Sequence, residues 1–221
     1  GDTARTLQHL LANGFFETAG HKTSASWIIS ITCVSTPLNG TTCVDFLGLS
    51  PDCLSVRWFS LLHLVVAAIM LVEWLTWGWL GRKLGIGHYQ HHHRGLVWIL
   101  RAVLFAQHPM INSGDWCVSD LSVRGAMKLN AHPTYDTTYY FSYVTKTSRA
   151  SPVKHSRFRT HWPAPRCHPF MMTLSACVGR WTHTTPVPCE GWKDQDWWEN
   201  DGPVPVASQA YPHVCQGARQ H

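Results

Sequence analysis

Acidic residues gather near the carboxyl end of the sequence, in the segment Gly191–Gly202. Four carboxylates fall within eight residues there, at Asp194, Asp196, Glu199 and Asp201. A solvated or calcium-binding loop is the simpler interpretation, although the spacing of a regular calcium loop with a terminal glutamate is absent. The sharper interpretation is one catalytic carboxylate on a turn that follows a strand. Residue types alone favour the solvated loop.

Histidine and cysteine, the usual ligands of transition metals, form two further candidate groups. The run His88–Arg94 is rich in histidine, but neighbouring residues point to different faces of any regular element. A solvated loop or helix start is therefore favoured over a metal site. The eight cysteines include no C-x-x-C pair, which excludes zinc-ribbon and thioredoxin spacing. Free thiols are favoured over disulfides, because a chain of 221 residues does not need covalent staples.

The overall composition is that of a folded protein. Hydrophobic residues make up 45% of the chain and charged residues 14%, which excludes disordered, collagen-like and low-complexity classes. The formal net charge of +5 comes from lysines and arginines scattered along the whole chain. A nucleic-acid-binding protein clusters such residues on one face or stripe, so we exclude nucleic acid as a partner.

Alternating helices and strands that could position the candidate groups predict an α/β fold with a parallel sheet. Leu7, Leu10 and Leu11 indicate one face of a helix that ends near Gly14. The β-branched run Trp27–Val34 indicates a short buried strand, and the loop Ser35–Thr42 after it is a usual place for chemistry.

A second helix and strand follow in the middle of the chain. The helix ends at Asn130 and is capped by Asp120 or Ser122, and Thr137–Thr145 predicts a strand. From Lys146 to Pro169 the composition predicts an excursion outside the core, and the short stretch Phe170–Val178 is apolar again.

The most apolar stretch is Trp58–Leu80, which is long enough to cross a bilayer. His63 and Glu73 within the run oppose a spanning helix, as does the crowding of tryptophans at one end. A buried, lid or interfacial helix is therefore favoured over a transmembrane one. A further helix is predicted over Gly95–Phe105.

Several segments, in order along the chain, resemble the thermostable bacterial lipases, the staphylococcal lipases and their plant lipase-like relatives. They are G-D-T-A-R-T-L-Q-H-L-L-A-N-G, W-I-I-S-I-T-C-V-S-T-P-L-N-G-T-T, S-G-D-W-C-V-S-D-L-S-V-R-G-A-M-K-L-N, T-Y-Y-F-S-Y-V-T-K-T-S and D-W-W-E-N-D-G. The resemblance implies an incomplete α/β-hydrolase fold over 1–221, the carboxyl-side part of the sheet, with 45–107 as a helical lid or cap. It also identifies the chain as a fragment.

The resemblance implies ester hydrolysis by a Ser, Asp and His triad, with Asp201 as the catalytic acid. Glu199 and Asn200 match the motif without a catalytic role. Asp115 falls on one zinc-ligand aspartate of the bacterial members, but the other ligands have no counterpart, so the zinc site is incomplete. The calcium site of the bacterial members is not carried over. The nucleophile turn G-x-S-x-G and the triad histidine are absent from the sequence.

Two functions remain open at this stage. The first is a fragment of a lipase-like carboxylic ester or triacylglycerol hydrolase. The second is a catalytically inactive lipase-like module that binds lipid or associates with a membrane. Both predict a lipid or ester at an interface as partner, with Trp58–Leu80 as the segment of membrane contact. The sequence indicates no compartment.

Overall fold

A computed structural model describes most of the chain: residues 2–52, 55–76, 79, 83, 96–105, 116–150, 161–164, 167–182 and 192–212. The chain divides into two compact units. One consists of 1–43 together with 120–221, and the other of 44–119. The second unit includes the predicted cap region 45–107, whose role as a lid stays a prediction.

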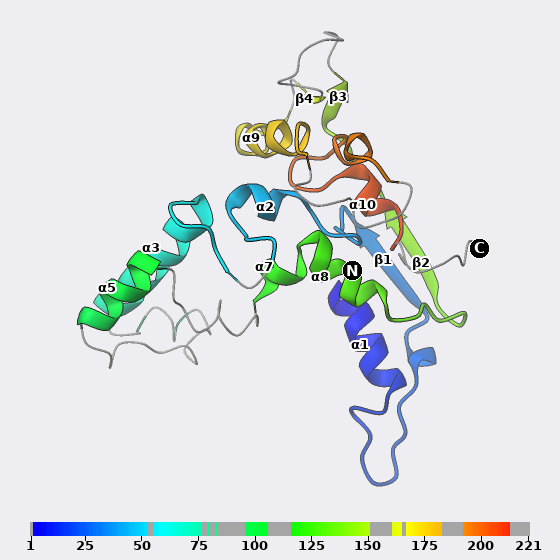
Figure 1. Ribbon diagram of the computed structural model, residues 1–221. Helices are drawn as coiled ribbons and strands as arrows, with labels where there is room; N and C mark the ends of the chain where they lie inside the picture. The colour runs from blue at the N-terminus through cyan, green and yellow to red at the C-terminus, as the bar shows by residue number, and fades with distance from the viewer. Residues whose placement is uncertain are drawn as a thin grey trace. The chain divides into compact units, whose positions relative to one another are not determined.

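A parallel pair of strands forms the centre of the first unit (Figure 1). β1 (Ser30–Val34) pairs with β2 (Tyr139–Tyr143), so the predicted parallel pairing is confirmed for the described residues. The strand expected from Trp27 begins later, because Ala25–Trp27 forms the 3-10 turn η1. Burial alternates along β1, so the expectation of a strand buried on both faces is wrong.

One face of the sheet holds the core of this unit. Ile31 and Cys33 of β1 are buried with Leu38, and Ala4, Ile28 and Tyr140 pack against them. Ala4 belongs to α1 (Asp2–Ala12), which ends before Gly14 at a φ of +69°. A positive φ costs glycine little, so the predicted stop at Gly14 is confirmed.

The buried face of α1 differs from the predicted leucine face. Leu7 is exposed, whereas Arg5, Gln8 and Leu11 are buried. The polar pair is tolerated because both side chains are hydrogen-bonded: Arg5 donates to Asn130, and Gln8 donates to Thr138 at 2.6 Å. Polar partners on distant elements thus reverse the pattern that hydrophobicity alone predicts.

α8 (Val123–Asn130) lies beside α1 and follows the short helix α7 (Cys117–Asp120). Ser122 caps α8, because its hydroxyl accepts a hydrogen bond from the Gly125 amide at 2.9 Å. Of the two predicted capping residues, Asp120 and Ser122, it is Ser122 that caps the helix. Asn130 ends the helix and is buried, and its side-chain amide donates to the Leu38 carbonyl at 2.9 Å.

The loop after β1 passes close to the start of α8 at Gly40. Gly40 has a φ of +80°, and a Cβ there would meet the Ser122 carbonyl oxygen at 2.4 Å. We expect Gly40→Ala to lower the free energy of unfolding by about 2 kcal/mol or more, from backbone strain and overpacking together. Urea denaturation measures it. Gly20→Ala is the control for strain alone, because nothing lies within 4 Å of its Cβ position at a φ of +93°. An equal loss of unfolding free energy in both variants would contradict a contribution from the close contact between Gly40 and the Ser122 carbonyl.

The described residues in the rest of the first unit include two short antiparallel strands and three short helices. β3 (Ser148–Ala150) and β4 (His161–Pro163) pair antiparallel, and α9 (Pro169–Val178) packs on β4. The 3-10 helix η3 (Asp194–Trp197) and α10 (Val206–Ala210) follow. The expected excursion over 146–169 therefore contains a small sheet, in which Ser148 is buried. Its hydrogen bonds to Asn200, described below, are the reason.

The second unit contains α2 (Cys43–Leu47, beginning in the first unit), α3 (Leu61–Leu75) and α5 (Leu96–Phe105). Ser60 caps α3 by accepting from the His63 amide at 3.1 Å, and α3 contacts α5. Met70 and Val66 are buried, but most apolar side chains of α3 are exposed. Within the described residues, no helix is both long and apolar enough to cross a membrane.

Two histidines of the first unit, His132 and His161, have pKa values lowered by their surroundings. His132 stacks on His9 with ring centroids 3.7 Å apart, and burial, His9 and Arg5 lower the pKa of His132 below 6.5. Burial also lowers the pKa of His161, against the opposing effect of Glu199. A folded-state pKa below the unfolded value means that the native state favours the neutral ring. The stabilisation is present above the unfolded pKa and is lost as pH falls.

We therefore expect the free energy of unfolding to decrease as the pH is lowered from about 7 to about 5. His132→Gln is expected to make this dependence shallower, because the variant side chain does not titrate. Urea denaturation at a series of pH values measures both. A stability that rises on acidification would contradict the assignment of His132 and His161 as the responsible groups.

Candidate functional site

Asp201 lies at the end of the parallel sheet where both strands finish. Its Oδ2 accepts a hydrogen bond from the Thr145 hydroxyl at 2.9 Å, and its Oδ1 accepts one from the Val204 amide at 3.0 Å. Thr145 follows β2, and its hydroxyl oxygen lies 2.6 Å from that of Ser35, the residue after β1. The carboxylate therefore stands at the carboxyl ends of parallel strands, where sites gather in open α/β sheets.

The Asp201 carboxylate is oriented and still has acceptor capacity. A carboxylate offers roughly four lone-pair sites on its two oxygens. The two hydrogen bonds described above occupy one on each oxygen, and the residue is half-buried. A carboxylate held in this way can accept a further N–H and can stabilise a cation beside it. This is the chemistry that an acid partner of a catalytic histidine requires.

Two hydroxyl groups connect Asp201 to both strands. The Thr145 hydroxyl has one proton, which the ionised carboxylate attracts more strongly than a neutral acceptor does. Ser35 is then the donor to Thr145, which gives the chain Ser35 to Thr145 to Asp201. The sequence predicts chemistry in the loop Ser35–Thr42 but singles out neither Ser35 nor Thr145. The available signal was a hydroxyl directly after one predicted strand, at Ser35, and at the end of the other, at Thr145.

Asn200 holds the loop that carries Asp201. Its side chain is 0% exposed and donates to the carbonyls of Ser175 at 3.1 Å and Trp198 at 2.8 Å. Its Oδ1 accepts from the Gly202 amide at 3.0 Å. Its backbone amide donates to the Ser148 hydroxyl at 2.8 Å, so the loop is joined to the chain after β2. Asn200, the residue before Asp201, is thus held in place, and it in turn holds Gly202, the residue after Asp201.

Gln209 of α10 holds Thr145 from the other side. The Thr145 amide donates to Gln209 Oε1 at 2.8 Å, and Gln209 Nε2 donates to the Val204 carbonyl at 3.2 Å. Gln209 is buried, as is Ser208, whose hydroxyl donates to the Gly40 carbonyl at 2.5 Å. α10 therefore joins the loop after β1, the end of β2 and the Asp201 loop into one site.

The other acidic residues of the predicted loop have separate roles. Asp196 accepts from the Lys193 amide at 2.8 Å at the start of η3. Glu199 pairs with Lys146 on the surface, where such a pair contributes little to stability. Across the residues that the structure describes, no group of three or more histidine, cysteine or acidic side chains is placed to hold a metal ion. The acids therefore do not converge as a calcium loop would require.

The remaining candidates for metal binding lie outside the described residues. These are Asp115, the predicted zinc ligand, and the histidine run His88–Arg94. Among the described cysteines, Cys33, Cys117, Cys167 and Cys177 have free thiols. Burial raises the pKa of the Cys177 thiol, against the opposing effect of Arg180. A buried thiol of raised pKa is a poor nucleophile, so Cys177 is a packing residue.

Comparison with solved structures identifies the fold. EstA from Clostridium botulinum matches with a TM-score of 0.59 and 22% identity, over 100% of this chain and 52% of that protein. Staphylococcus hyicus lipase matches with a TM-score of 0.61 and 19% identity, over 96% of this chain and 51% of the lipase. No family model and no curated protein matches the sequence.

The chain shares the α/β-hydrolase fold of these two enzymes and spans about half of the length of each. At this sequence identity the structural similarity shows the fold alone and does not show which reaction the chain takes part in. The predicted α/β class is confirmed, and a partial hydrolase sheet is compatible with the parallel pair of β1 and β2.

Proposed function

We propose that this chain is the acid-bearing part of a lipase-like carboxylic ester hydrolase. The observation that carries the proposal is the position of Asp201, held on both carboxylate oxygens at the carboxyl ends of β1 and β2. The hydrolase fold of the two structural neighbours supports it. In this role Asp201 accepts the Nδ1–H of a histidine and fixes its tautomer. It then stabilises the imidazolium formed when that histidine takes the proton of an attacking serine.

The nucleophile and the histidine belong, in this proposal, to polypeptide outside the 221 residues. The sequence contains no G-x-S-x-G turn, the element that exposes the nucleophile in this fold. The contribution of this chain is to position the acid through Thr145, Ser35 and Asn200. The carboxylate stays ionised throughout, and the proton moves between serine, histidine and the leaving alcohol.

We also propose that the second unit contacts a lipid surface, with α3 as the contacting element. Its exposed apolar side chains support this: Leu61, Leu64, Val65, Ile69, Leu71, Val72 and Leu75. Trp58 precedes the helix and is exposed, and tryptophan suits a boundary between apolar and aqueous phases. Exposed apolar surface of this extent marks an interaction site.

The same exposed surface favours a second candidate function, a lipid-binding module without turnover. Hydrolysis of 4-nitrophenyl butyrate and tributyrin separates the two, with flotation on phosphatidylcholine vesicles as the binding measurement. The natural polypeptide that contains this sequence, purified from the cells that make it, is expected to hydrolyse both esters. The 221-residue chain alone is expected to hydrolyse neither.

Two outcomes would contradict the proposal, the first its hydrolytic activity and the second its assignment of the nucleophile and the histidine to polypeptide outside the 221 residues. One is vesicle binding by the cell-produced polypeptide without hydrolysis of either ester, which favours the lipid-binding module. The other is turnover by the 221-residue chain alone that Asp201→Ala abolishes, because the acid would then act without a second polypeptide segment.

A further inference from the structure

The sequence contains two asparagine–glycine pairs, Asn13–Gly14 and Asn39–Gly40, and the fold holds them in different surroundings. An asparagine followed by glycine can close into a ring, because glycine has no Cβ to keep its backbone nitrogen away from the asparagine side chain. The nitrogen attacks the side-chain amide carbon, ammonia leaves, and water opens the resulting succinimide to aspartate or isoaspartate. Whether a pair reacts therefore depends on how firmly the fold holds it.

The pair Asn39–Gly40 is held by hydrogen bonds in a buried position. Asn39 is 3% exposed, its Nδ2 donates to the Tyr211 carbonyl at 2.8 Å, and its Oδ1 accepts from Asn130 at 3.0 Å. The Gly40 amide donates to the Pro37 carbonyl at 2.9 Å. The attacking nitrogen and the carbon that it would attack are both fixed, so this pair is closed to the reaction.

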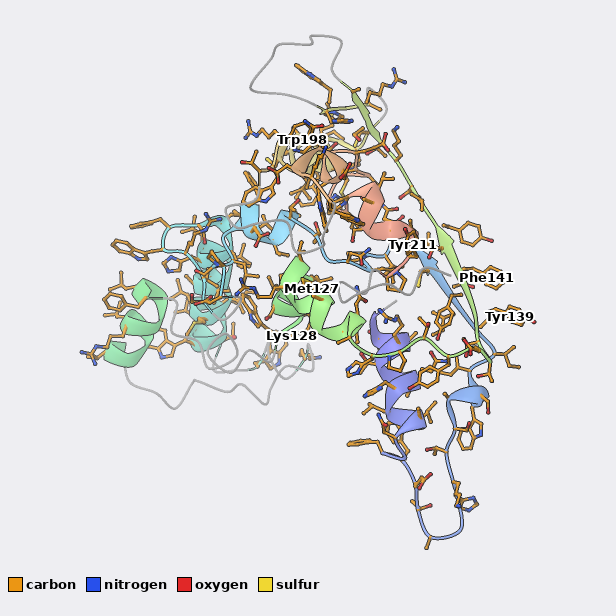
Figure 2. All side chains as sticks on the ribbon, turned by 45° about the vertical axis from the view of Figure 1, so that its right-hand side comes forward. Met127, Lys128, Tyr139, Phe141, Trp198 and Tyr211 are labelled. Atoms are coloured by element: carbon orange, nitrogen blue, oxygen red, sulfur yellow. The ribbon has the colours of Figure 1, made fainter. Side chains whose placement is uncertain are left out.

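The pair Asn13–Gly14 lies at the exposed end of α1. Asn13 is exposed, and the Gly14 amide nitrogen is 3.4 Å from the Leu11 carbonyl oxygen, which is long for a backbone hydrogen bond. Figures 1 and 2 show the segment between α1 and η1 as an open loop that extends outward past the start of β1. Helix ends fray at little cost in free energy. This pair can therefore leave the helical conformation that separates the nitrogen from the amide carbon.

Two titratable side chains flank the exposed pair. His9 lies one turn earlier on α1, and its Nε2 is 2.9 Å from Asn13 Nδ2, the nitrogen that would leave. Glu17 folds back over Gly14, so that a Cβ on this glycine would be 3.0 Å from Glu17 Oε2. Glu17 Oε1 accepts from the Thr23 amide at 3.3 Å, which holds the carboxylate in this place. A base thus lies beside the residue whose nitrogen must lose a proton, and an imidazole lies beside the nitrogen that must gain one.

We propose that Asn13–Gly14 is a self-modification site, at which His9 and Glu17 promote succinimide formation. The Glu17 carboxylate takes the proton of the Gly14 amide as the Gly14 nitrogen bonds to Asn13 Cγ. The bond from Cγ to Nδ2 then breaks, and protonated His9 gives its proton to Nδ2, which leaves as ammonia. The proton on Glu17 returns to His9 through solvent. Water is the co-reactant that opens the ring, and no step depends on ester hydrolysis.

The product changes the carboxyl end of α1. Aspartate or isoaspartate places a new negative charge there, where the helix dipole disfavours an anion. Isoaspartate also adds a methylene group to the backbone at the turn that Gly14 closes. The loss of ammonia makes this a one-way change.

Peptide mapping by mass spectrometry of the natural polypeptide that contains this sequence, incubated at neutral pH, tests the site. Trypsin cuts after Arg5 and Lys22, so Asn13 is the only asparagine of its peptide. Asn13 is expected to deamidate at least about 10-fold faster than Asn39 in the folded protein. In urea the two rates are expected to become similar, because the fold then holds neither pair.

Two substitutions test the flanking side chains. Glu17→Gln and His9→Gln are each expected to slow deamidation of Asn13 at least about 3-fold in the folded protein and to leave the rate in urea unchanged. His21→Gln, at an exposed histidine of the same loop, is the control and is expected to leave the rate unchanged in both conditions.

Three outcomes would overturn the proposal. A rate at Asn13 no faster than at Asn39 in the folded protein would exclude a reactive site at the end of α1. A difference between the two rates that persists in urea would assign it to local sequence instead of the fold. An unchanged rate in both Glu17→Gln and His9→Gln would show that neither side chain promotes the reaction. None of these measurements uses esterase activity, so a failed hydrolase proposal leaves the test intact.

Discussion

Replacement of Asp201 by asparagine is expected to lower kcat/KM for ester hydrolysis about 10⁴-fold in the polypeptide as cells produce it. An amide keeps the shape of the carboxylate, but its NH₂ group cannot accept the imidazole N–H, so the histidine adopts the wrong tautomer. Thr145 and Val204 each donate to a different oxygen of Asp201. These two hydrogen bonds hold the carboxylate in one orientation, so the substitution changes a group of fixed position. Hydrolysis of 4-nitrophenyl butyrate measures the loss.

Glu199→Gln is the matched control, two residues before Asp201 on the same loop. It exchanges a carboxylate for an amide in the surface pair with Lys146 and is expected to change kcat/KM less than about 3-fold. Thermal denaturation of both variants checks that the fold is retained. An Asp201→Asn enzyme as fast as the parent would show that another group orients the histidine.

The sequence predicts Asp201 but not the groups that hold it. The motif E-N-D-G and the order of the surrounding segments resemble the lipases, and this resemblance singles out the carboxylate as the proposed acid, which stays a prediction. Ser35 and Thr145 are separated by 110 residues, and the parallel register of β1 and β2 is what brings their hydroxyls together. Register between distant strands follows from long-range pairing, which a local pattern does not encode.

The sequence predicts neither the one-sided burial of β1 nor the buried polar residues of α1. Ile31 and Cys33 alternate with exposed residues, as a strand with one covered face requires. Arg5 and Gln8 are not among the leucines of the predicted face of α1, yet both are buried. Their partners Asn130 and Thr138 lie more than a hundred residues away in sequence. Hydrophobic periodicity assigns polar residues to solvent unless the partner is known.

The predicted excursion over 146–169 stays a prediction, but its described residues include the short strands β3 and β4, which the composition does not predict. Its composition of arginine, histidine and proline favours a loop, but Ser148 bonds the backbone of the Asp201 loop through both its own amide and its own side chain. The Ser148 amide donates to the Asn200 carbonyl at 3.0 Å, and its hydroxyl accepts from the Asn200 amide at 2.8 Å. The polar strand β3 is therefore held by hydrogen bonds to the Asp201 loop, and both of these bonds are made with Asn200.

Replacement of Asn200 by alanine is expected to lower the free energy of unfolding by about 3–5 kcal/mol. The substitution leaves the Trp198 carbonyl and the Gly202 amide without their side-chain partner, and it removes one of the two hydrogen bonds to the Ser175 carbonyl, which keeps the bond from the Gly179 amide. Each buried polar group without a partner costs about 1–3 kcal/mol. Urea denaturation followed by tryptophan fluorescence measures the effect, because Trp197 and Trp198 lie next to Asn200 in sequence.

Asn200→Asp separates lost hydrogen bonding from lost volume. An aspartate keeps the size of the side chain and can still accept from Gly202, but it places an anionic oxygen where Nδ2 donates to two carbonyls. It is expected to destabilise at least as much as alanine. Asn13→Ala, at an exposed position, is the control and is expected to change stability by less than about 0.5 kcal/mol. If Asn200→Asp were as stable as the parent, the Nδ2 donations would not be what holds the loop, and the support of Asp201 would rest on Thr145 and Gln209 instead.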